Sequence, residues 1–136
     1  MRFSTKIGLV VRDDLAAWKR LNVTAFLSGG IAGAIGETVG LPYRDGSGVD
    51  YLPMLRQPVL VFTADAGALN RAHGRALGRG LRVGVYTEEL FGTDNDADNR
   101  AAVAAVPTEK LALVGIAVYG PRADVDKALK GLTLHP

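Results

Sequence analysis

Short apolar runs alternate with segments of helical periodicity along most of this chain. The apolar runs predict four strands, at 6–11, 59–62, 81–86 and 113–119. Apolar residues with a helical period predict helices at about 22–35, 65–79 and 122–132, and an alanine-rich stretch before Pro107 predicts a further short one. Strands that alternate with helices indicate a sheet with helices on both faces.

The middle of the chain departs from this pattern. Residues 40–58 contain the turn sequence Asp45-Gly46-Ser47-Gly48 between short apolar stretches, which predicts a hairpin. This segment is too short to have a core of its own, so residues 1–136 are predicted to form one domain. The predicted fold class is α/β, a three-layer α/β/α arrangement with a mixed sheet of about four strands and the small hairpin as an excursion.

Composition excludes several functions. The net charge is +2, too small for the whole protein to attract nucleic acid through its electrostatic potential. The absence of cysteine excludes disulfides and thiol chemistry. No apolar run reaches the ~20 residues of a membrane span, so we expect a cytoplasmic protein with no membrane partner. His73 and His135 are far apart and make neither a zinc site nor a Ser–His dyad. No P-loop, G-x-S-x-G or H-E-x-x-H motif is present, and no cofactor or metal is expected.

The first predicted strand ends in the charged sequence Arg12-Asp13-Asp14. In open α/β sheets, ligands bind outside the carboxyl ends of the strands. Asp13 and Asp14 are therefore candidates for an acid/base pair or for ligand binding, with Arg12 beside them. The alternative is a charged turn in which an aspartate accepts hydrogen bonds from the backbone.

A second group of candidates surrounds the expected start of the first helix. Trp18 could stack on a ring, although a lone tryptophan is more often a core anchor or a lid. Lys19 and Arg20 supply positive charge. Asn22 is the expected cap, and with Thr24 it would place free backbone amides where an anion can bind.

Polar side chains are also concentrated in the loop after the third predicted strand. The sequence Asp94-Asn95-Asp96-Ala97-Asp98-Asn99-Arg100 matches a calcium loop only in part, because Asn99 and Ala105 replace the expected glycine and glutamate. An exposed loop with Asp96 or Asp98 as a helix cap is the favoured interpretation. If its strand is parallel to the first, this loop completes the same pocket, and Arg56 could join it from the hairpin. The candidate ligand-binding residues of the loop are Asn95, Asp96, Asp98, Asn99 and Arg100.

The first predicted helix contains three glycines, Gly29, Gly30 and Gly33, each of which costs about 1 kcal/mol relative to alanine. Tight packing of the helix on the sheet is the favoured explanation, and a dimer contact or a ligand is the alternative. The buried face is expected to carry Val23, Phe26, Leu27, Ile31 and Ile35.

Three arginines, Arg71, Arg75 and Arg79, are spaced by four and share one face of the second predicted helix. A solvated face is the ordinary explanation, and a surface that binds phosphate is the alternative.

Several segments together resemble the domain of unknown function two-thousand family. They are Val10-Val11-Arg12-Asp13-Asp14-Leu15, Leu21 to Leu27, Tyr51 to Pro58 and Asn95 to Arg100. The family is similar in fold to the type 2 peptidyl-tRNA hydrolases, which are commonly dimeric, and the resemblance therefore implies a homodimer. The similarity includes Arg12 to Asp14 and the sequences Val114-Gly115-Ile116 and Gly120-Pro121.

The motifs that carry hydrolase activity are altered in this chain. Only Lys19 and Arg20 supply charge in the segment where the hydrolases have two lysines, and their Gln and His fall on Phe26 and Gly29. The leading hypothesis is a pocket at the sheet edge that binds, or transforms, a small polar or phosphate-bearing ligand. In a hydrolytic reaction Asp13 or Asp14 would orient water, while Lys19, Arg20 or Arg100 would stabilise negative charge. Two alternatives are a degenerate hydrolase-like protein that binds tRNA or RNA, and a structural dimeric module that uses the glycine-lined face.

Overall fold

The centre of the fold is a mixed sheet built around β1 (Thr5–Arg12). β1 runs parallel to β4 (Val59–Ala64) and antiparallel to β6 (Leu113–Pro121). The edge strands are β5 (Arg82–Thr87) and β7 (Thr133–Leu134), which gives the order β5-β6-β1-β4-β7. The computed structural model describes residues 2–136. The predicted mixed α/β class is confirmed, and β7 is an additional fifth strand too short to leave a pattern in the sequence.

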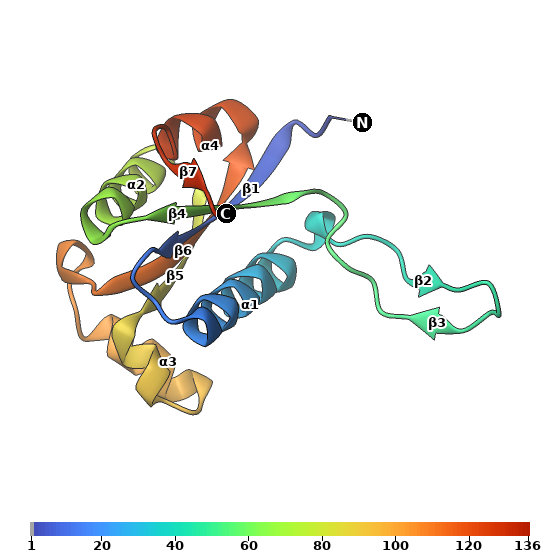
Figure 1. Cartoon of the computed structure of the whole chain (residues 1–136), viewed down its shortest axis with the longest axis horizontal. Coiled ribbons are helices and arrows are strands. Elements are labelled where there is room, and N and C mark those ends of the chain that lie inside the picture. Colours follow the sequence, from blue (N-terminus) through green and yellow to red (C-terminus); the bar gives the residue numbers. More distant parts are fainter. Residues whose placement is uncertain (1) are drawn as a thin grey trace.

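Helices cover the sheet on both faces (Figure 1). α1 (Ala17–Ala34) packs on one face against β1, β5 and β6, while α2 (Ala66–Gly78) and α4 (Arg122–Ala128) pack on the other. Alternate residues of β1 enter the two cores, because successive side chains of a strand point to opposite faces. Leu9 and Val11 join the α1 core, whereas Val10 joins the α2 and α4 core.

Three short helical segments and one further helix lie in the connections. They are η1 (Gly36–Thr38), η2 (Glu88–Gly92), η3 (Thr108–Lys110) and α3 (Asp96–Ala104). α3 lies beside the end of β5 and near the first half of α1 (Figure 1). The cap of α3 is Asn95, whose side chain accepts a hydrogen bond from the backbone amide of Asp98, rather than the expected Asp96 or Asp98.

The start of α1 corrects the sequence prediction. The helix begins at Ala17, and its cap residue Ala16 makes no side-chain capping bond. Asn22 is therefore an interior residue and not a cap, and Trp18 lies inside the first turn. The free amides of this helix belong to that first turn, so the anion site expected at Asn22 and Thr24 is not at the helix start. α4 is shorter than predicted, ending at Ala128.

The predicted hairpin is present as an extended arm. β2 (Tyr43–Arg44) and β3 (Asp50–Tyr51) pair antiparallel and form a separate two-stranded sheet. The arm projects from the body beyond the end of α1 (Figure 1). No helix in the described part of the chain is long and apolar enough to cross a membrane.

Candidate functional site

The carboxyl ends of β1, β4 and β5 share one edge of the sheet, and the charged residues after β1 lie there. Arg12 crosses this edge. Its guanidinium donates to Asp14 at 2.6 Å and to Glu88 at 2.7 Å, and it also approaches the carbonyl of Leu113 at 3.3 Å. Arg12 lowers the pKa of Asp14, chiefly through the hydrogen bond between the two side chains. Asp14 is thus the ionised, largely exposed partner of an ion pair with Arg12, a poor arrangement for a general acid or base.

The neighbouring aspartate is held by its backbone. The Asp13 amide donates to the carbonyl of Ala64 at 2.9 Å, and its own carbonyl accepts from Arg20 at 2.7 Å. Arg20 also donates to the carbonyl of Leu15 at 2.8 Å, and its guanidinium lies 3.2 Å from the ring of His135. Arg20 therefore ties the turn after β1 to the end of the chain, which is a structural role.

Arg20 and Thr24 face a different cavity from the other candidates. Both line a cavity of about 440 Å³ on the β1 and β4 side of α1, together with apolar residues and His135. The Thr24 hydroxyl donates to the carbonyl of Leu21 within its own helix. Arg56 lies at the opposite end of the sheet, where it donates to the Glu37 carbonyl and its guanidinium lies over the ring of Phe3. The structure does not bring Arg56 to the predicted pocket.

An aromatic cluster joins α1 to the end of β5. Tyr86 is buried, and its ring meets Phe26 at 5.8 Å and Phe91 at 5.0 Å between centroids. The Asn22 amide donates to the Tyr86 hydroxyl at 3.0 Å, which explains why this polar residue is placed inside the helix. Burial raises the pKa of Tyr86, and the bond from Asn22 opposes this effect. Tyr86 is therefore a neutral phenol at physiological pH.

Two further candidates extend this cluster. The Trp18 ring meets Phe91 edge to face, with centroids 5.9 Å apart. The Lys19 ammonium lies 4.8 Å from the centre of the Phe91 ring and 5.6 Å from that of Trp18. This is cation–π geometry, because a cation within about 6 Å of a ring centre is attracted to the face of the ring. Trp18 and Lys19 thus form the outer end of the aromatic cluster.

A cavity of about 440 Å³ opens between α1, β5, η2 and α3. One side is apolar and aromatic, with Phe26 and Tyr86, and the other is formed by polar residues of α3. The residues from α3 include Asp96, Asn99 and Arg100, with Val103 and Ala104 below them. Arg100 donates to Asp96 at 2.8 Å in an exposed i, i+4 pair, which is weak and easily rearranged by an anion. We call this space the α1–α3 cavity.

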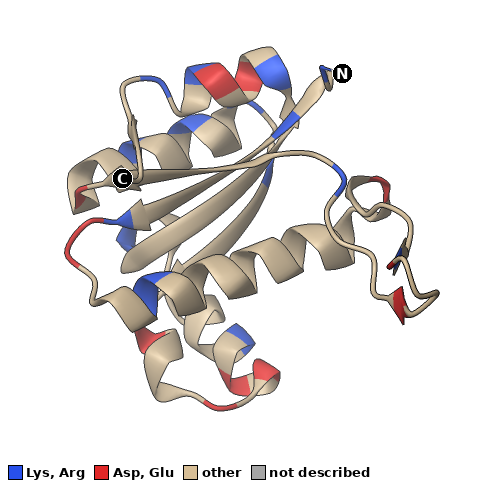
Figure 2. Ribbon diagram, turned by 45° about the vertical axis from the view of Figure 1, so that its right-hand side comes forward, with Lys and Arg blue, Asp and Glu red and all other residues tan. Residues whose placement is uncertain are grey.

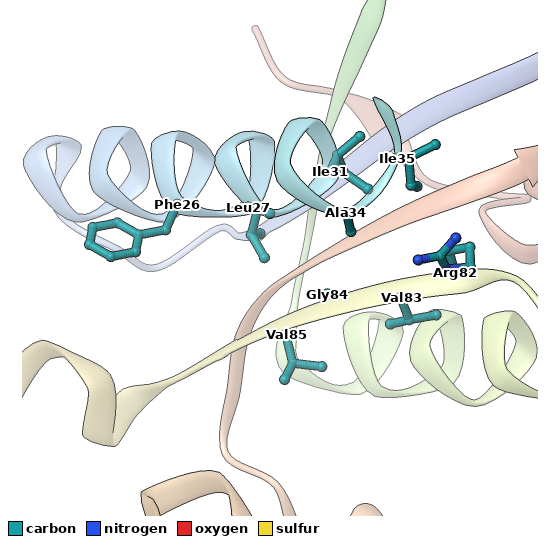
Figure 3. Close-up of a pocket in the computed structure, with 10 residues that line it drawn as sticks. Phe26, Leu27, Ile31, Ala34, Ile35, Arg82, Val83, Gly84 and Val85 are labelled. Carbon is teal, nitrogen blue, oxygen red and sulfur yellow. The ribbon is translucent and has the colours of Figure 1, made fainter. Parts of the chain in front are cut away.

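The α1–α3 cavity adjoins a narrower groove that follows α1 and the edge strand β5. This groove of about 200 Å³ shares Phe26, Leu27 and Val85 with it. Figure 3 shows that Arg82 carries the only charged side chain among those drawn, with apolar side chains from both elements along the remaining length. The two spaces therefore form a mainly apolar channel with polar groups concentrated at its α3 end.

The structure brings together only some of the predicted site residues. Asp96, Asn99 and Arg100 line the α1–α3 cavity, Asn22 supports its tyrosine, and Trp18 and Lys19 lie next to it. The other candidates lie elsewhere, in the ion pairs, the cap and the separate cavity described above: Arg12, Asp13, Asp14, Arg20, Thr24, Arg56, Asn95 and Asp98.

The main residues that sequence reasoning missed are aromatic. Phe26 was expected in the core, but its side chain is 57% exposed and lines the cavity. Tyr86 is the last residue of the predicted strand 81–86, and no role is predicted for Phe91. The available signal was the position of Tyr86 near the carboxyl end of β5 and of Phe91 in the segment that follows, at the edge of the sheet where ligands are expected.

The arginine pattern of α2 lies on the other face of the sheet from α1. Arg79 forms an ion pair with Asp124 of α4 at 3.1 Å, and Arg75 reaches the carbonyl of Lys130 at 3.5 Å. Two of the three arginines thus contact the α4 region. Also on α2, burial lowers the pKa of His73, which lines a separate cavity of about 260 Å³. Among residues 2–136, no group of three or more His, Cys, Asp or Glu side chains could hold a metal.

Comparison with known proteins identifies a family whose function is not known. The family model described as "Protein of unknown function (DUF2000)" matches residues 5–136. A solved structure of a protein of unknown function from Agrobacterium tumefaciens strain C58 is 44% identical, with a TM-score of 0.95. The match covers 99% of this chain and 100% of that one. A search of curated proteins found no match.

Proposed function

This chain belongs to the DUF2000 family of proteins of unknown function, and we propose that it binds a small amphipathic metabolite in the α1–α3 cavity. The ligand has a flat apolar body and an anionic group, either a phosphate or a carboxylate. One observation carries this proposal: aromatic rings and an arginine with a weak internal partner line the same cavity. We also propose that the protein acts in the cytoplasm, which suits a chain without cysteine.

The rings of Phe26 and Tyr86 would contact the flat body of the ligand. Ligand cavities are mostly apolar, with a few polar groups that fix orientation, and the α1–α3 cavity has this composition. Asn99 would supply amide hydrogen bonds, and Arg100 would exchange its exposed partner Asp96 for the anionic group of the ligand. Lys19 lies beside Phe91 and adds positive charge at the outer end.

Binding is favoured over catalysis because the carboxylates have other roles. Asp14 is engaged by Arg12, and Asp96 is engaged by Arg100. The pKa of Asp14 is lowered, so it does not hold a proton near neutral pH. We therefore propose a binding protein rather than an enzyme. We also propose that its fold is related to that of the type 2 peptidyl-tRNA hydrolases, which the residues at the ends of β1 and β6 support. A tRNA ligand is disfavoured because the arginines of α2 lie on the face opposite the cavity.

Paired probes test the proposal by NMR. Adenosine is compared with adenosine 5′-monophosphate, and indole with indole-3-acetate, so that each pair differs by an anionic group. We expect the anionic member to shift the amide signals of Tyr86, Asn99 and Arg100 most strongly. Arg100→Ala should lower the affinity for the anionic probe about tenfold, equivalent to about 1.4 kcal/mol. The affinity for the neutral probe should not change.

Arg79→Ala is the matched control, because Arg79 is also paired with an aspartate but lies on α2. It should leave both members unaffected. The proposal would be overturned if the NMR signals that shift belonged only to residues outside the cavity. It would also be overturned if the Arg100 and Arg79 variants bound the anionic probe equally well. Hydrolysis of an N-blocked aminoacyl-tRNA by the wild-type protein would instead support the hydrolase alternative.

A further inference from the structure

The outer face of α1 lacks the polar surface that a solvent-facing helix normally has. No charged residue occurs from Leu21 to Ala34, and Figure 2 shows α1 without blue or red beyond its first turns. The inner face is buried through Val23, Leu27 and Ile31, yet on the outer side Leu21 is 70% exposed. The polar residues of this stretch, Asn22, Thr24 and Ser28, are uncharged and partly buried, so its exposed outer side consists of apolar and small residues. Such an exposed apolar surface is typical of an interaction site.

Small residues make the same outer face flat. Gly29 and Gly33 are exposed, and a Cβ added at either would meet no atom within 4 Å. The expected explanation of these glycines, tight packing on the sheet, is therefore wrong, because they face away from it. Ala25 is also exposed on this side. Another chain can approach the helix backbone closely here.

The arm, residues 41–54, is the second unpartnered region of the molecule. Every residue from 41 to 52 is exposed. Beyond the β2–β3 pair and its turn, backbone hydrogen bonds close the base of the arm, from the Gly40 amide to the Met54 carbonyl and from the Arg56 amide to the Thr38 carbonyl. In the views of Figures 1 and 2 the arm points away from the body beyond the end of α1, so it leaves its own helix face uncovered.

Although its residues 41–52 are all exposed, the arm is internally ordered. Arg44 pairs with Asp50 at 2.7 Å. Asp45 accepts hydrogen bonds from the backbone amides of Ser47 and Val49 and from the Tyr51 hydroxyl. The charges and polar groups of the arm are thus largely satisfied within it. A preordered element loses little conformational entropy when it docks.

Apolar side chains remain exposed on the arm. Tyr43 lies directly opposite Tyr51 on one face of the hairpin, and the alternation of side chains places Leu41, which is 84% exposed, on the same face. The charged pair of Arg44 and Asp50 occupies the other face, because side chains alternate along a strand. A lone two-stranded hairpin is marginal in water, so the apolar side of the arm also requires a partner.

We propose that each region covers the other in a symmetric homodimer, in which the arm of one copy lies along the outer face of α1 of a second copy. The lengths agree, because six or so extended residues on each side of the arm span about 20 Å and the 18 residues of α1 span about 27 Å. The charges agree as well: the helix face is uncharged, and the arm's Arg44 and Asp50 neutralise each other.

The available area also matches a stable dimer. Large apolar side chains that are about half or more exposed lie on the Tyr43 face of the arm and on the outer side of α1. They are Leu41, Tyr43, Val49 and Tyr51, and Trp18 and Leu21. Together they offer roughly 700 Å², given that a large aromatic side chain presents about 150–250 Å², and the exposed Ala25, Gly29 and Gly33 add to this area. A standard interface buries about 800 Å² per partner. A twofold axis forms both arm–helix contacts at once.

Sedimentation equilibrium of the full chain tests the dimer. We expect a mass of twice 14.3 kDa. Ala25→Lys places a charge at the centre of the helix face without touching the core, and Leu41→Lys does the same on the apolar face of the arm. Each should raise the dissociation constant at least tenfold and leave the circular dichroism spectrum unchanged. Leu77→Lys, an exposed apolar position on α2, is the control and should leave the dimer intact.

Cross-linking tests the arrangement, because the chain has no cysteine of its own. A mixture of Ala25→Cys and Leu41→Cys proteins, treated with a short bismaleimide, should give a covalent dimer that joins one copy of each. A monomeric wild-type protein at the highest attainable concentration would overturn the proposal. A dimer that persists in both lysine variants, or the absence of the mixed cross-link, would also overturn it. These readouts use no ligand and are independent of the proposed function.

Discussion

The two faces of α1 show how the same residue type serves opposite purposes. Beneath the inner face, Gly115 of β6 leaves room for the helix, because a Cβ there would lie 2.5 Å from the Val23 side chain and 3.1 Å from the Val10 carbonyl oxygen. On the outer face, a Cβ at Gly33 would meet nothing within 4 Å. The first glycine is required by packing within the chain, whereas the second makes no such contribution. The difference separates the packed body from an open surface, which we propose a second copy covers.

The largest effect is expected from a core residue on the inner face. Ile31→Ala removes a buried side chain between α1 and the sheet and leaves a cavity. The free energy of unfolding should fall by about 2–5 kcal/mol, as measured by urea denaturation. Ala25→Ser on the outer face is the control and should change it by less than about 0.5 kcal/mol. Equal losses in the two variants would mean that the faces do not differ as described.

Overpacking beneath the inner face should have the next largest effect. Gly115→Ala places a methyl group against Val23 and the backbone oxygen of Val10. Because the backbone oxygen cannot move freely, we expect a loss of about 1–3 kcal/mol, measured in the same way. A second substitution, Val23→Ala, should recover part of this loss by removing the closest contact. If Gly115→Ala were neutral, the close approach of α1 to β6 would not be required.

The sequence predicts the interior of this fold better than its surfaces. The apolar runs are sufficient to place β1, β4, β5 and β6, because each contains an unbroken run of at least four apolar or glycine residues. The two classes of glycine cannot be told apart in the sequence, since the difference depends on which face of the helix each one occupies. β7 has two residues, and a pattern with a period of two needs more.

The candidate site is predicted less completely, because it depends on contacts between residues that are far apart in the sequence. Asn22 resembles a cap, but its partner is the Tyr86 hydroxyl, 64 positions away in the chain. With Asn22 taken as the cap, the helix start was placed too late, because Ala16 offers no capping side chain. Phe26 lies next to Leu27 at the border of the buried face, and helical periodicity does not resolve that border. The α3 residues Asn99 and Arg100 were found because they follow a strand that reaches the expected edge.

On the outer face of α1, a glycine-to-alanine substitution should increase the free energy of unfolding, by less than the losses expected on the inner face. Gly33→Ala adds a methyl group in open space inside a helix, so it should stabilise the monomer by up to about 1 kcal/mol. Gly74→Ala of α2 has the same open surroundings and is the matched control. Thermal denaturation should show a gain for both at low protein concentration. At high concentration the gain at Gly33 should shrink, because the added methyl group hinders the docked arm, whereas the gain at Gly74 should persist.

The smallest effect concerns the arm alone and depends on pH. Hydrogen bonds from the Tyr51 hydroxyl and from the amides of Val49 and Ser47 lower the pKa of Asp45. A carboxylate with a lowered pKa stabilises the ordered arm above its usual pKa of about 3.9, and this contribution is lost as the pH falls through the lowered value. The amide signals of Ser47 and Val49 should therefore move toward random-coil positions only in strongly acidic solution. Asp45→Asn should show such shifts at neutral pH, while the signals of β1 remain unchanged. If the β1 signals moved in parallel, the arm would be coupled to the body, and the separation between the two regions would not hold.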